Sequence, residues 1–313
     1  MKRIAFVFPG QGSQEVGMGK AFYDQYESVR EQFAKADDRL GVSLSQYMLE
    51  GPEETLTKTE NAQPALLLLS TSIAQLLKDE GIKPELVAGH SLGEYSAHVA
   101  AGTMSQEEAL SLVQKRGQLM EEAVPAGQGS MAAVLGLDIE RIEHVTSAIR
   151  DQGQVVEVAN YNCPGQIVIS GSKEGVDQAC ERLKEEGAKR ALPLNVSGPF
   201  HSRLMKPASE QFESELKGVS LQEAEVPVVA NVTAEPVQDK DQIFNSLVEQ
   251  LYSPVRFEET IRYMMDQDID AFVEVGNGKV LSGLIRKVNR RMKTFNIQDP
   301  ESLEAFLEWY KED

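Results

Sequence analysis

A serine flanked by glycines has the setting in this chain that most suggests covalent chemistry. Residues 86–89 form an apolar run typical of a buried strand, and Gly89-His90-Ser91-Leu92-Gly93 leads from it into a helix-forming segment at residues 92–101. A nucleophile on a sharp strand-to-helix turn needs small neighbours two positions away, and the free helix amides face any oxyanion formed there. We therefore predict that Ser91 is a nucleophile rather than part of a merely flexible connection.

A serine nucleophile needs a base, and the chain offers four histidines. His90 adjoins the serine at a turn where neighbouring side chains diverge, so we expect it to pack behind the site. His98 falls on the following helix and His144 on a polar helix face, which indicates structural or exposed positions. His201 lies in a turn, residues 197–202, from which a side chain can reach across a cleft. We predict that His201 is the base.

An arginine on an apolar helix face also needs an explanation. Residues 105–122 predict a helix, with Ser105 as its N-cap and Glu108 completing a capping box. At about 100° per residue, Arg116 falls in the middle of the apolar face. A buried guanidinium is costly unless an anion meets it. Two interpretations stay open at this point, a salt bridge to a core carboxylate and the binding of an anionic substrate.

The elements that must position these residues alternate between strand and helix patterns. Strands are predicted at residues 3–8, 86–89, 226–232 and 271–275, and helices at 18–40 (one long or two short), 64–81, 92–101, 105–122, 205–216, 242–251, from 254, and after 278. Proline suits the first turn of a helix, so Pro64 is expected to begin the second one. This alternation predicts an α/β fold with a mostly parallel sheet.

The middle of the chain has a different order of elements. Strands are predicted at residues 131–137, 155–160, 166–170 and 190–196, with helices at 138–150 and 173–186. The resulting βαββαβ order is that of a ferredoxin-like unit. We predict a small subdomain at residues 128–197, inserted into a large discontinuous subdomain formed by residues 1–127 and 198–313.

Composition excludes several classes of protein. The 313 residues carry a net charge of −18, which disfavours nucleic acid as a partner. The apolar start breaks at Pro9, and no later run is long enough for a membrane span, so we expect a cytoplasmic protein with no membrane partner. Cys163 and Cys180 lack metal-type spacing, so we expect reduced thiols and no metal site. A monomer is the expected state.

Two alternative families do not fit these spacings. The glycine-rich turn at residues 9–14 lacks both the third glycine of a dinucleotide fingerprint and the Lys-Ser/Thr pair of a P-loop, so we expect it to present backbone amides. In α/β-hydrolases the catalytic histidine comes late, whereas 112 residues (313 − 201) follow His201, and no carboxylate stands out as a third triad member. The chain also has no Asp-Gly pair, the signature of patatin-like lipases.

Six motifs, spread over nearly the whole chain, together resemble the malonyl-CoA:acyl carrier protein transacylases. They are Phe8-Pro9-Gly10-Gln11-Gly12-Ser13-Gln14, Gln63-Pro64-Ala65, Gly89-His90-Ser91-Leu92-Gly93-Glu94, Arg116-Gly117, Gly198-Pro199-Phe200-His201 and Gln250-Leu251-Tyr252-Ser253-Pro254-Val255. One such motif would be weak, but the ordered set is specific. The resemblance implies an α/β-hydrolase-like large subdomain with a ferredoxin-like insert.

The resemblance also implies roles for individual residues. Ser91 would be the nucleophile and His201 its base, with the backbone amides of Gln11 and Leu92 as oxyanion hole. Arg116 would meet the malonyl carboxylate, and the main-chain carbonyl of Gln250 would orient the histidine in place of an acid. The cleft-lining positions would be Asn160, Asn162 and Phe200, although the two asparagines are nearly as well explained as turn formers.

The implied activity is transfer of malonyl from malonyl-CoA to acyl carrier protein through a malonyl-serine, with coenzyme A thioester as substrate and no cofactor. Because acyl carrier protein is acidic as a family, we expect it to dock on a local basic patch, with Lys189, Arg190, Arg286 and Lys287 as candidates. Two alternatives remain, a trans-acting malonyl acyltransferase of a polyketide pathway and a non-enzymatic carrier-binding scaffold. Phe200 resembles malonyl-type rather than methylmalonyl-type members.

Overall fold

Two β-sheets organise the chain, of which the computed structural model describes residues 2–312. The strands of the larger sheet are β1 (Ile4–Phe8), β2 (Leu86–Gly89), β7 (Val228–Val229), β8 (Pro236–Val237), β9 (Ala271–Val275) and β10 (Lys293–Ile297). Their order is β10-β9-β1-β2-β7-β8, and all neighbours pair in parallel except β8, which is antiparallel to β7. Every residue of β1, β2 and β9 is buried, which explains why their sequences are apolar apart from Glu274 in β9.

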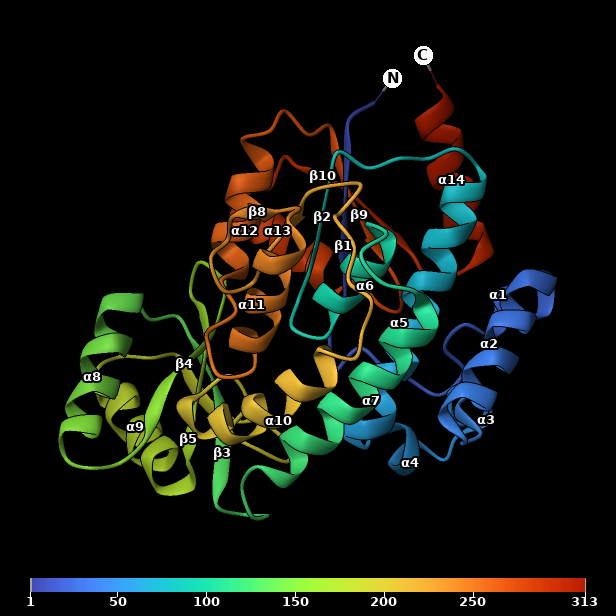
Figure 1. Ribbon diagram of the computed structural model, residues 1–313. Coiled ribbons are helices and arrows are strands. Elements are labelled where there is room, and N and C mark those ends of the chain that lie inside the picture. Colours follow the sequence, from blue (N-terminus) through green and yellow to red (C-terminus); the bar gives the residue numbers. More distant parts are fainter. Residues whose placement is uncertain (1, 313) are drawn as a thin grey trace.

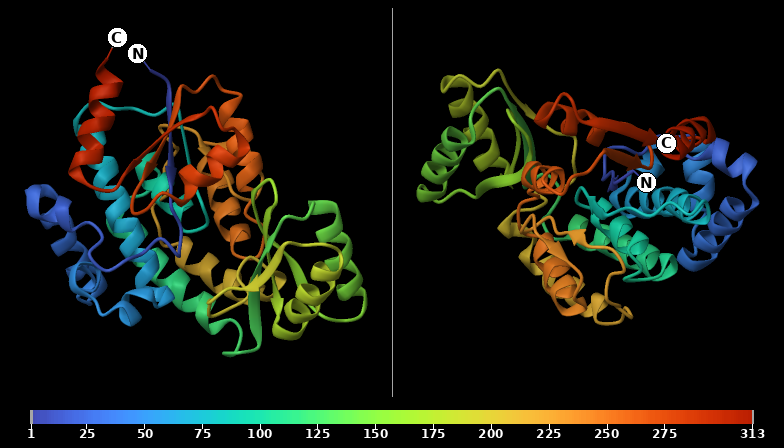
Figure 2. Two further views of the ribbon diagram at one scale, coloured as in Figure 1. Left: turned by 180° about the vertical axis from the view of Figure 1, so that it is seen from behind. Right: turned by 90° about the horizontal axis from the view of Figure 1, so that it is seen from above.

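The smaller sheet and two helices come from one continuous stretch. Its elements are β3 (Gly129–Leu135), α8 (Ile139–Asp151), β4 (Val156–Cys163), β5 (Gln166–Ser172), α9 (Lys173–Glu185) and β6 (Arg190–Pro193). The four strands are antiparallel in the order β4-β5-β3-β6, which is the ferredoxin-like arrangement. Figures 1 and 2 show this green-to-yellow part projecting to one side of the molecule, with α8 and α9 on its outer face.

Helices cover both faces of the larger sheet (Figure 1). They are α1 (Lys20–Gln25), α2 (Glu27–Leu40), α3 (Leu44–Glu50), α4 (Glu53–Thr57), α5 (Thr59–Asp79), α6 (Gly93–Ala100), α7 (Gln106–Glu122), the 3-10 turn Arg203–Met205, α10 (Lys206–Leu216), α11 (Lys240–Gln250), α12 (Phe257–Met265), α13 (Val280–Val288) and α14 (Pro300–Lys311). Alternate residues of β1 face two separate cores: Ile4, Phe6 and Phe8 join the core with α5, α6 and α7, whereas Ala5 and Val7 join the one with α12 and α13.

The buried helix α5 corrects one expectation. The helix begins at Thr59, so Pro64 lies inside it rather than in its first turn. Nearly all of its side chains are buried, because it packs in the main hydrophobic core. Tertiary packing of this kind stabilises a helix well beyond its intrinsic propensity. The helix therefore tolerates the loss of the one backbone hydrogen bond that the proline removes near the helix start.

Other boundaries differ where local sequence is a weak guide. The apolar stripe before residue 41 forms two helices, α1 and α2, separated by the extended backbone of Tyr26. The capping box of Ser105 and Glu108 is present on α7 as predicted. Strands β6 and β7 are much shorter than expected, and α3, α4, β8, β10 and α14 were not predicted. The chain after β6 is irregular and supplies residues to the cavity described below.

Strand β4 of the smaller sheet is joined by backbone hydrogen bonds to the segment before α12. The Tyr161 N–H donates to the Val255 carbonyl at 2.9 Å, and the Val255 N–H donates to the Ala159 carbonyl at 2.8 Å. Main-chain bonds of this kind hold the antiparallel sheet against the segment that precedes α12. Among the described residues, no helix is both long and apolar enough to cross a membrane.

Candidate active site

Ser91 lies on a tight turn between β2 and α6, as the motif predicts. Its backbone is left-handed, with φ of 52°. A Cβ at Gly89 would lie 1.9 Å from the carbonyl carbon of Gly93, and a Cβ at Gly93 would lie 2.0 Å from the Phe8 carbonyl oxygen. Glycine is therefore required at both positions, because α6 packs directly on the ends of β1 and β2.

The structure brings Ser91 and His201 together across 110 residues of sequence. The serine Oγ lies 2.7 Å from His201 Nε2, and His201 Nδ1 lies 2.9 Å from the main-chain oxygen of Gln250. A carbonyl only accepts, so Nδ1 carries the proton and Nε2 is left to accept the serine hydroxyl. His201 also has left-handed backbone, with φ of 56°, and is almost fully buried.

The surroundings of His201 keep its imidazole neutral. Burial, and then the nearby positive charge of Arg116, lower the pKa of His201 to about 3, although the hydrogen bond to the Gln250 carbonyl acts in the opposite direction. Both lowering effects disfavour the imidazolium form. The free site therefore holds a neutral imidazole, whose unprotonated Nε2 is in contact with the serine hydroxyl.

Arg116 reaches the same hydroxyl from α7. Its Nη2 lies 3.2 Å from Ser91 Oγ and 3.0 Å from Gln250 Oε1, and its Nη1 donates to Gln63 Oε1 at 2.9 Å. The guanidinium carbon lies 5.2 Å from the centre of the Tyr95 ring. Within residues 2–312, no carboxylate oxygen lies within 4.0 Å of its nitrogens, so the structure contains no core salt bridge at Arg116.

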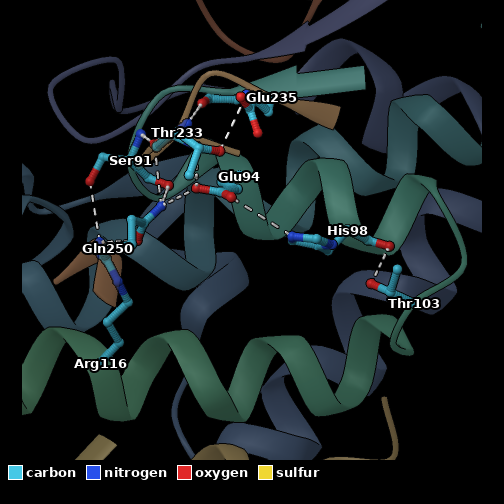
Figure 3. Close-up of polar contacts among 10 residues, drawn as sticks. Ser91, Glu94, His98, Thr103, Arg116, Thr233, Glu235 and Gln250 are labelled. Carbon is cyan, nitrogen blue, oxygen red and sulfur yellow. Dashed lines mark hydrogen bonds and ion pairs between the residues drawn. The ribbon is translucent and has the colours of Figure 1, made fainter. Parts of the chain in front are cut away.

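A buried polar network supports the serine turn from behind (Figure 3). Gln250 Nε2 donates to the Ser91 carbonyl at 2.9 Å and to Glu94 Oε2 at 2.7 Å. Asn231 accepts from the Ser91 N–H at 2.8 Å and donates to the Gly89 carbonyl at 2.6 Å. The turn is thus held by two side chains, Gln250 and Asn231, that come from distant parts of the sequence. Such a network has high energetic value only when fully satisfied.

The sequence did not assign a role to three members of this network. Glu94 and Gln63 lie inside motifs that carried the family resemblance, and their burial at 0% exposure was the missing information. Asn231 follows the two-residue strand β7 and has no local signal. Its contacts to the serine turn span about 140 positions, which only the fold specifies.

The two amides expected to form an oxyanion hole lie beside the serine. Gln11 and Ser91 both line a cavity of about 390 Å³, together with Met131, Asn160, Phe200 and His201. Among the described residues, neither the Gln11 N–H nor the Leu92 N–H donates to another protein group. The Ser91 N–H is engaged by Asn231, so it is not free for this purpose. The Gln11 side chain donates a hydrogen bond from its Nε2 to Thr59 Oγ1 at 3.2 Å.

The remaining candidates of the cleft separate into two groups. Asn160 and Phe200 line the cavity, and the Asn160 backbone forms a bridge to Val255. Asn162 instead lies 2.7 Å, Oδ1 to Nε2, from His90, and it does not line the cavity. His90 contacts this asparagine rather than the serine hydroxyl, and burial lowers the pKa of its imidazole.

The four candidate docking residues are exposed and lie outside the cavity: Lys189, Arg190, Arg286 and Lys287. Two of them, Arg190 and Lys287, lie near one end of the smaller sheet. Arg190 of β6 pairs with Leu135, which pairs on its other side with Gln166, and Lys287 Nζ donates to Gln166 Oε1 at 3.2 Å. The described residues contain no group of three side chains suited to a metal ion.

Known proteins resemble this chain over its full length. The acyl transferase domain family matches residues 5–298. A Bacillus subtilis (strain 168) protein named malonyl CoA-acyl carrier protein transacylase is 52% identical over 313 residues, which cover 100% of this chain and 99% of that protein. Among solved structures, the malonyl CoA-acyl carrier protein transacylase of Coxiella burnetii has a TM-score of 0.96 at 40% identity, with 98% and 97% of the two chains covered.

A malonyl-transacylase solved in complex with its type II PKS acyl-carrier protein also matches, with a TM-score of 0.95 at 44% identity and coverage of 98% and 99%. These likenesses confirm the predicted α/β class with its antiparallel second sheet. They also confirm the predicted enzyme class, since the relatives are named as transacylases. The chain is therefore an acyltransferase that belongs to the malonyl CoA-acyl carrier protein transacylase family.

Proposed function

We propose that this acyltransferase moves a malonyl group from malonyl-CoA to the phosphopantetheine thiol of acyl carrier protein, and so supplies fatty acid elongation. The transfer passes through a malonyl ester on Ser91. The names of the full-length relatives support this substrate pair. In the structure itself, one observation carries the proposal: a buried guanidinium without an anion contacts the nucleophile.

That guanidinium explains why the donor should carry a carboxylate. Arg116 is 1% exposed, and burial lowers its pKa from the ordinary value. Its positive charge is therefore destabilised by the loss of hydrating water. Its N–H groups donate to amide and hydroxyl oxygens, but no anion contacts it directly. An acyl group on Ser91 that ends in a carboxylate can form two parallel hydrogen bonds with the guanidinium. Acetyl lacks this group and leaves the cation desolvated and unpaired.

In the first half-reaction, His201 Nε2 takes the proton of Ser91 as Oγ attacks the thioester carbon of malonyl-CoA. The Gln11 and Leu92 amides receive the oxyanion of the tetrahedral intermediate. The C–S bond then breaks, and coenzyme A leaves as a thiol with the proton from His201. The Gln250 carbonyl holds the imidazolium in place at its Nδ1–H, so no triad acid is needed.

Donor binding also strengthens the base. The positive charge of Arg116 is the second largest cause of the low pKa of His201. A malonyl carboxylate paired with Arg116 cancels much of that charge and raises the proton affinity of the imidazole. The correct donor therefore helps to activate the nucleophile that attacks it.

In the second half-reaction, the carrier thiol takes the place of coenzyme A. His201 removes the thiol proton, the thiolate attacks the malonyl ester, and Ser91 Oγ leaves with that proton. Ping-pong kinetics follow from this order. Reactant and product are both thioesters, so the exchange is reversible.

Intact mass spectrometry tests the proposal directly. Purified protein incubated with malonyl-CoA should gain one malonyl group, and holo carrier protein should remove it. Ser91→Ala should remain folded and gain no group, because only the attacking side-chain oxygen is lost. A malonyl adduct on Ser91→Ala would assign the nucleophile elsewhere, and no adduct on the wild type would favour a carrier-binding scaffold instead.

A polyketide carrier is the second candidate acceptor. The solved malonyl-transacylase bound to a type II PKS acyl-carrier protein matches 98% of this chain. Its chemistry at the serine would be identical, so only the acceptor distinguishes the two functions. Comparing kcat/KM of malonyl transfer to a fatty acid carrier and to a polyketide carrier decides between them.

A further inference from the structure

The charge of Arg116 has to be compensated within the free protein, and the arrangement of its neighbours shows how. Glu94 is fully buried near it, in the first turn of α6. The Gln250 amide separates the two, because its Oε1 accepts from Arg116 and its Nε2 donates to Glu94. Figure 3 shows these side chains converging beneath the serine turn.

We propose, building on the function above, that Glu94 is a positioning residue that acts on Arg116 through the Gln250 amide. Its carboxylate fixes the orientation of that amide and supplies the buried counter-charge of the guanidinium. Arg116 is thereby stabilised in the free enzyme, and among the described residues no carboxylate contacts it before the donor binds.

Hydrogen bonding leaves the Gln250 amide one acceptable orientation. Nε2 faces three acceptors: Glu94 Oε2, the Ser91 carbonyl at 2.9 Å and Asn231 Oδ1 at 3.3 Å. With the amide turned over, Oε1 would face those oxygens and Nε2 would face the guanidinium. Glu94 is the strongest of the three acceptors, since it can be charged. Gln250 also offers its main-chain carbonyl to His201, so the placement of Gln250 affects both the base and the arginine.

The partners of Glu94 fit an ionised carboxylate. Its Oε2 accepts from two N–H groups, the side-chain Nε2 of Gln250 at 2.7 Å and the backbone N–H of Asn231 at 3.3 Å. The first turn of α6 places it at the positive end of a helix, which favours an anion. Its Oε1 has no hydrogen-bond partner among the described residues, and His98 Nε2 lies 3.9 Å from it.

Indirect contact has a functional consequence that a direct ion pair would lack. A carboxylate placed directly against Arg116 would form a bidentate pair and occupy the edge needed by the donor. A neutral amide between the two charges transmits part of the electrostatic stabilisation of the guanidinium. It also leaves the guanidinium without a carboxylate in direct contact. Glu94 thus lowers the cost of the free cation, and it also weakens the attraction of that cation for the donor carboxylate.

Glu94→Gln separates this role from a packing role, because it removes the charge and keeps the shape and an acceptor for Gln250. With the competing anion gone, we expect tighter malonyl-CoA binding, about three- to tenfold in the apparent Kd of the acylation burst. The Kd for acetyl-CoA should not change, since acetyl has no carboxylate. Thermal stability of the free variant should fall, and malonylation of Ser91 should raise its Tm by more than it raises that of the wild type.

Two further variants complete the test. Ser96→Ala, on the same helix and equally buried, should leave both donor affinities unchanged. In an Arg116→Ala background, Glu94→Gln should no longer alter the Kd for malonyl-CoA, because the residue through which it acts is absent. Unchanged or uniformly weakened binding of both donors in Glu94→Gln would overturn the proposal. If wild-type protein gained no malonyl group, the proposed function would fail first and independently of Glu94.

Discussion

The two sides of the cleft are built by different means. On the serine side, backbone packing sets the geometry: β1, β2 and α6 approach so closely that only glycine fits at Gly89 and Gly93. On the histidine side, a loop after β6 carries His201, and hydrogen bonds to Ser91 and Gln250 fix its ring. A short motif can encode the first arrangement, whereas the second depends on contacts between distant segments.

The largest effect is expected where backbone packing is disturbed. Gly93→Ala places a methyl group 2.0 Å from the Phe8 carbonyl oxygen, so α6 must shift away from β1. We expect a loss of at least about 1–3 kcal/mol in unfolding free energy, together with loss of acylation. Urea denaturation measures the first and intact mass the second.

A matched glycine provides the control for this change. Gly283 lies within α13, and a Cβ there would meet no atom within 4 Å. Gly283→Ala should stabilise the protein by about 0.5–1 kcal/mol, because alanine is the better helix former. If both substitutions had the same effect, close approach of α6 would not be what fixes the serine.

Removing the base should be nearly as costly for activity and harmless to the fold. His201→Ala should reduce the acylation rate by about 10² to 10⁴ through loss of general base catalysis. The pKa of about 3 in the free protein means that the wild-type kcat/KM should stay flat as the pH falls from 8 toward 5, since the base is unprotonated throughout. An acid limb near 6.5 in the pH profile would show that the imidazole is not held in its neutral form.

The same contrast explains what the sequence could reveal. Ser91 and its glycines, the capping box on α7 and the βαββαβ order are local patterns, and the structure contains all of them. Elimination among four histidines found the one that contacts the serine. Arg116 was recognisable as a buried cation, although its position on a helix face left two interpretations open.

What the sequence could not reveal depends on distant contacts. Asn231 accepts a hydrogen bond from the serine turn although it lies about 140 residues away in the sequence. The Gln250 side chain contacts four residues, which are Ser91, Glu94, Arg116 and Asn231. The edge strand β8 has two residues, which is too short for a period-two pattern to be visible. Pro64 gave a helix start that burial of α5 overrode.

Arg116→Ala tests whether the guanidinium that contacts Ser91 from α7 selects the donor. Malonyl transfer should fall by roughly 10², at about 1.4 kcal/mol per tenfold, while acetyl transfer holds steady or rises. Arg116→Lys should recover little, because a point charge cannot form two parallel hydrogen bonds.

The same substitution has a second signature in the pH profile. Loss of the positive charge removes the second largest of the causes that lower the pKa of His201, so the acid limb of kcat/KM should move to higher pH. An equal fall in transfer of malonyl and acetyl, together with a large drop in Tm, would indicate that Arg116 supports the fold rather than donor choice.

The smallest effect is expected outside the cavity, where neither backbone packing nor buried hydrogen bonds act. Arg190 and Lys287 are exposed near the same end of the smaller sheet, and a carrier protein rich in acidic residues would be attracted to them. Arg190→Glu and Lys287→Glu should each raise KM for the carrier several-fold, mainly through a slower, salt-dependent association. Acylation by malonyl-CoA should be unchanged, because neither residue lines the cavity. Lys35→Glu, an exposed change of equal charge on α2, is the control and should affect neither half-reaction. If Lys35→Glu raised the carrier KM as much as the other two, net charge rather than a defined patch would govern docking.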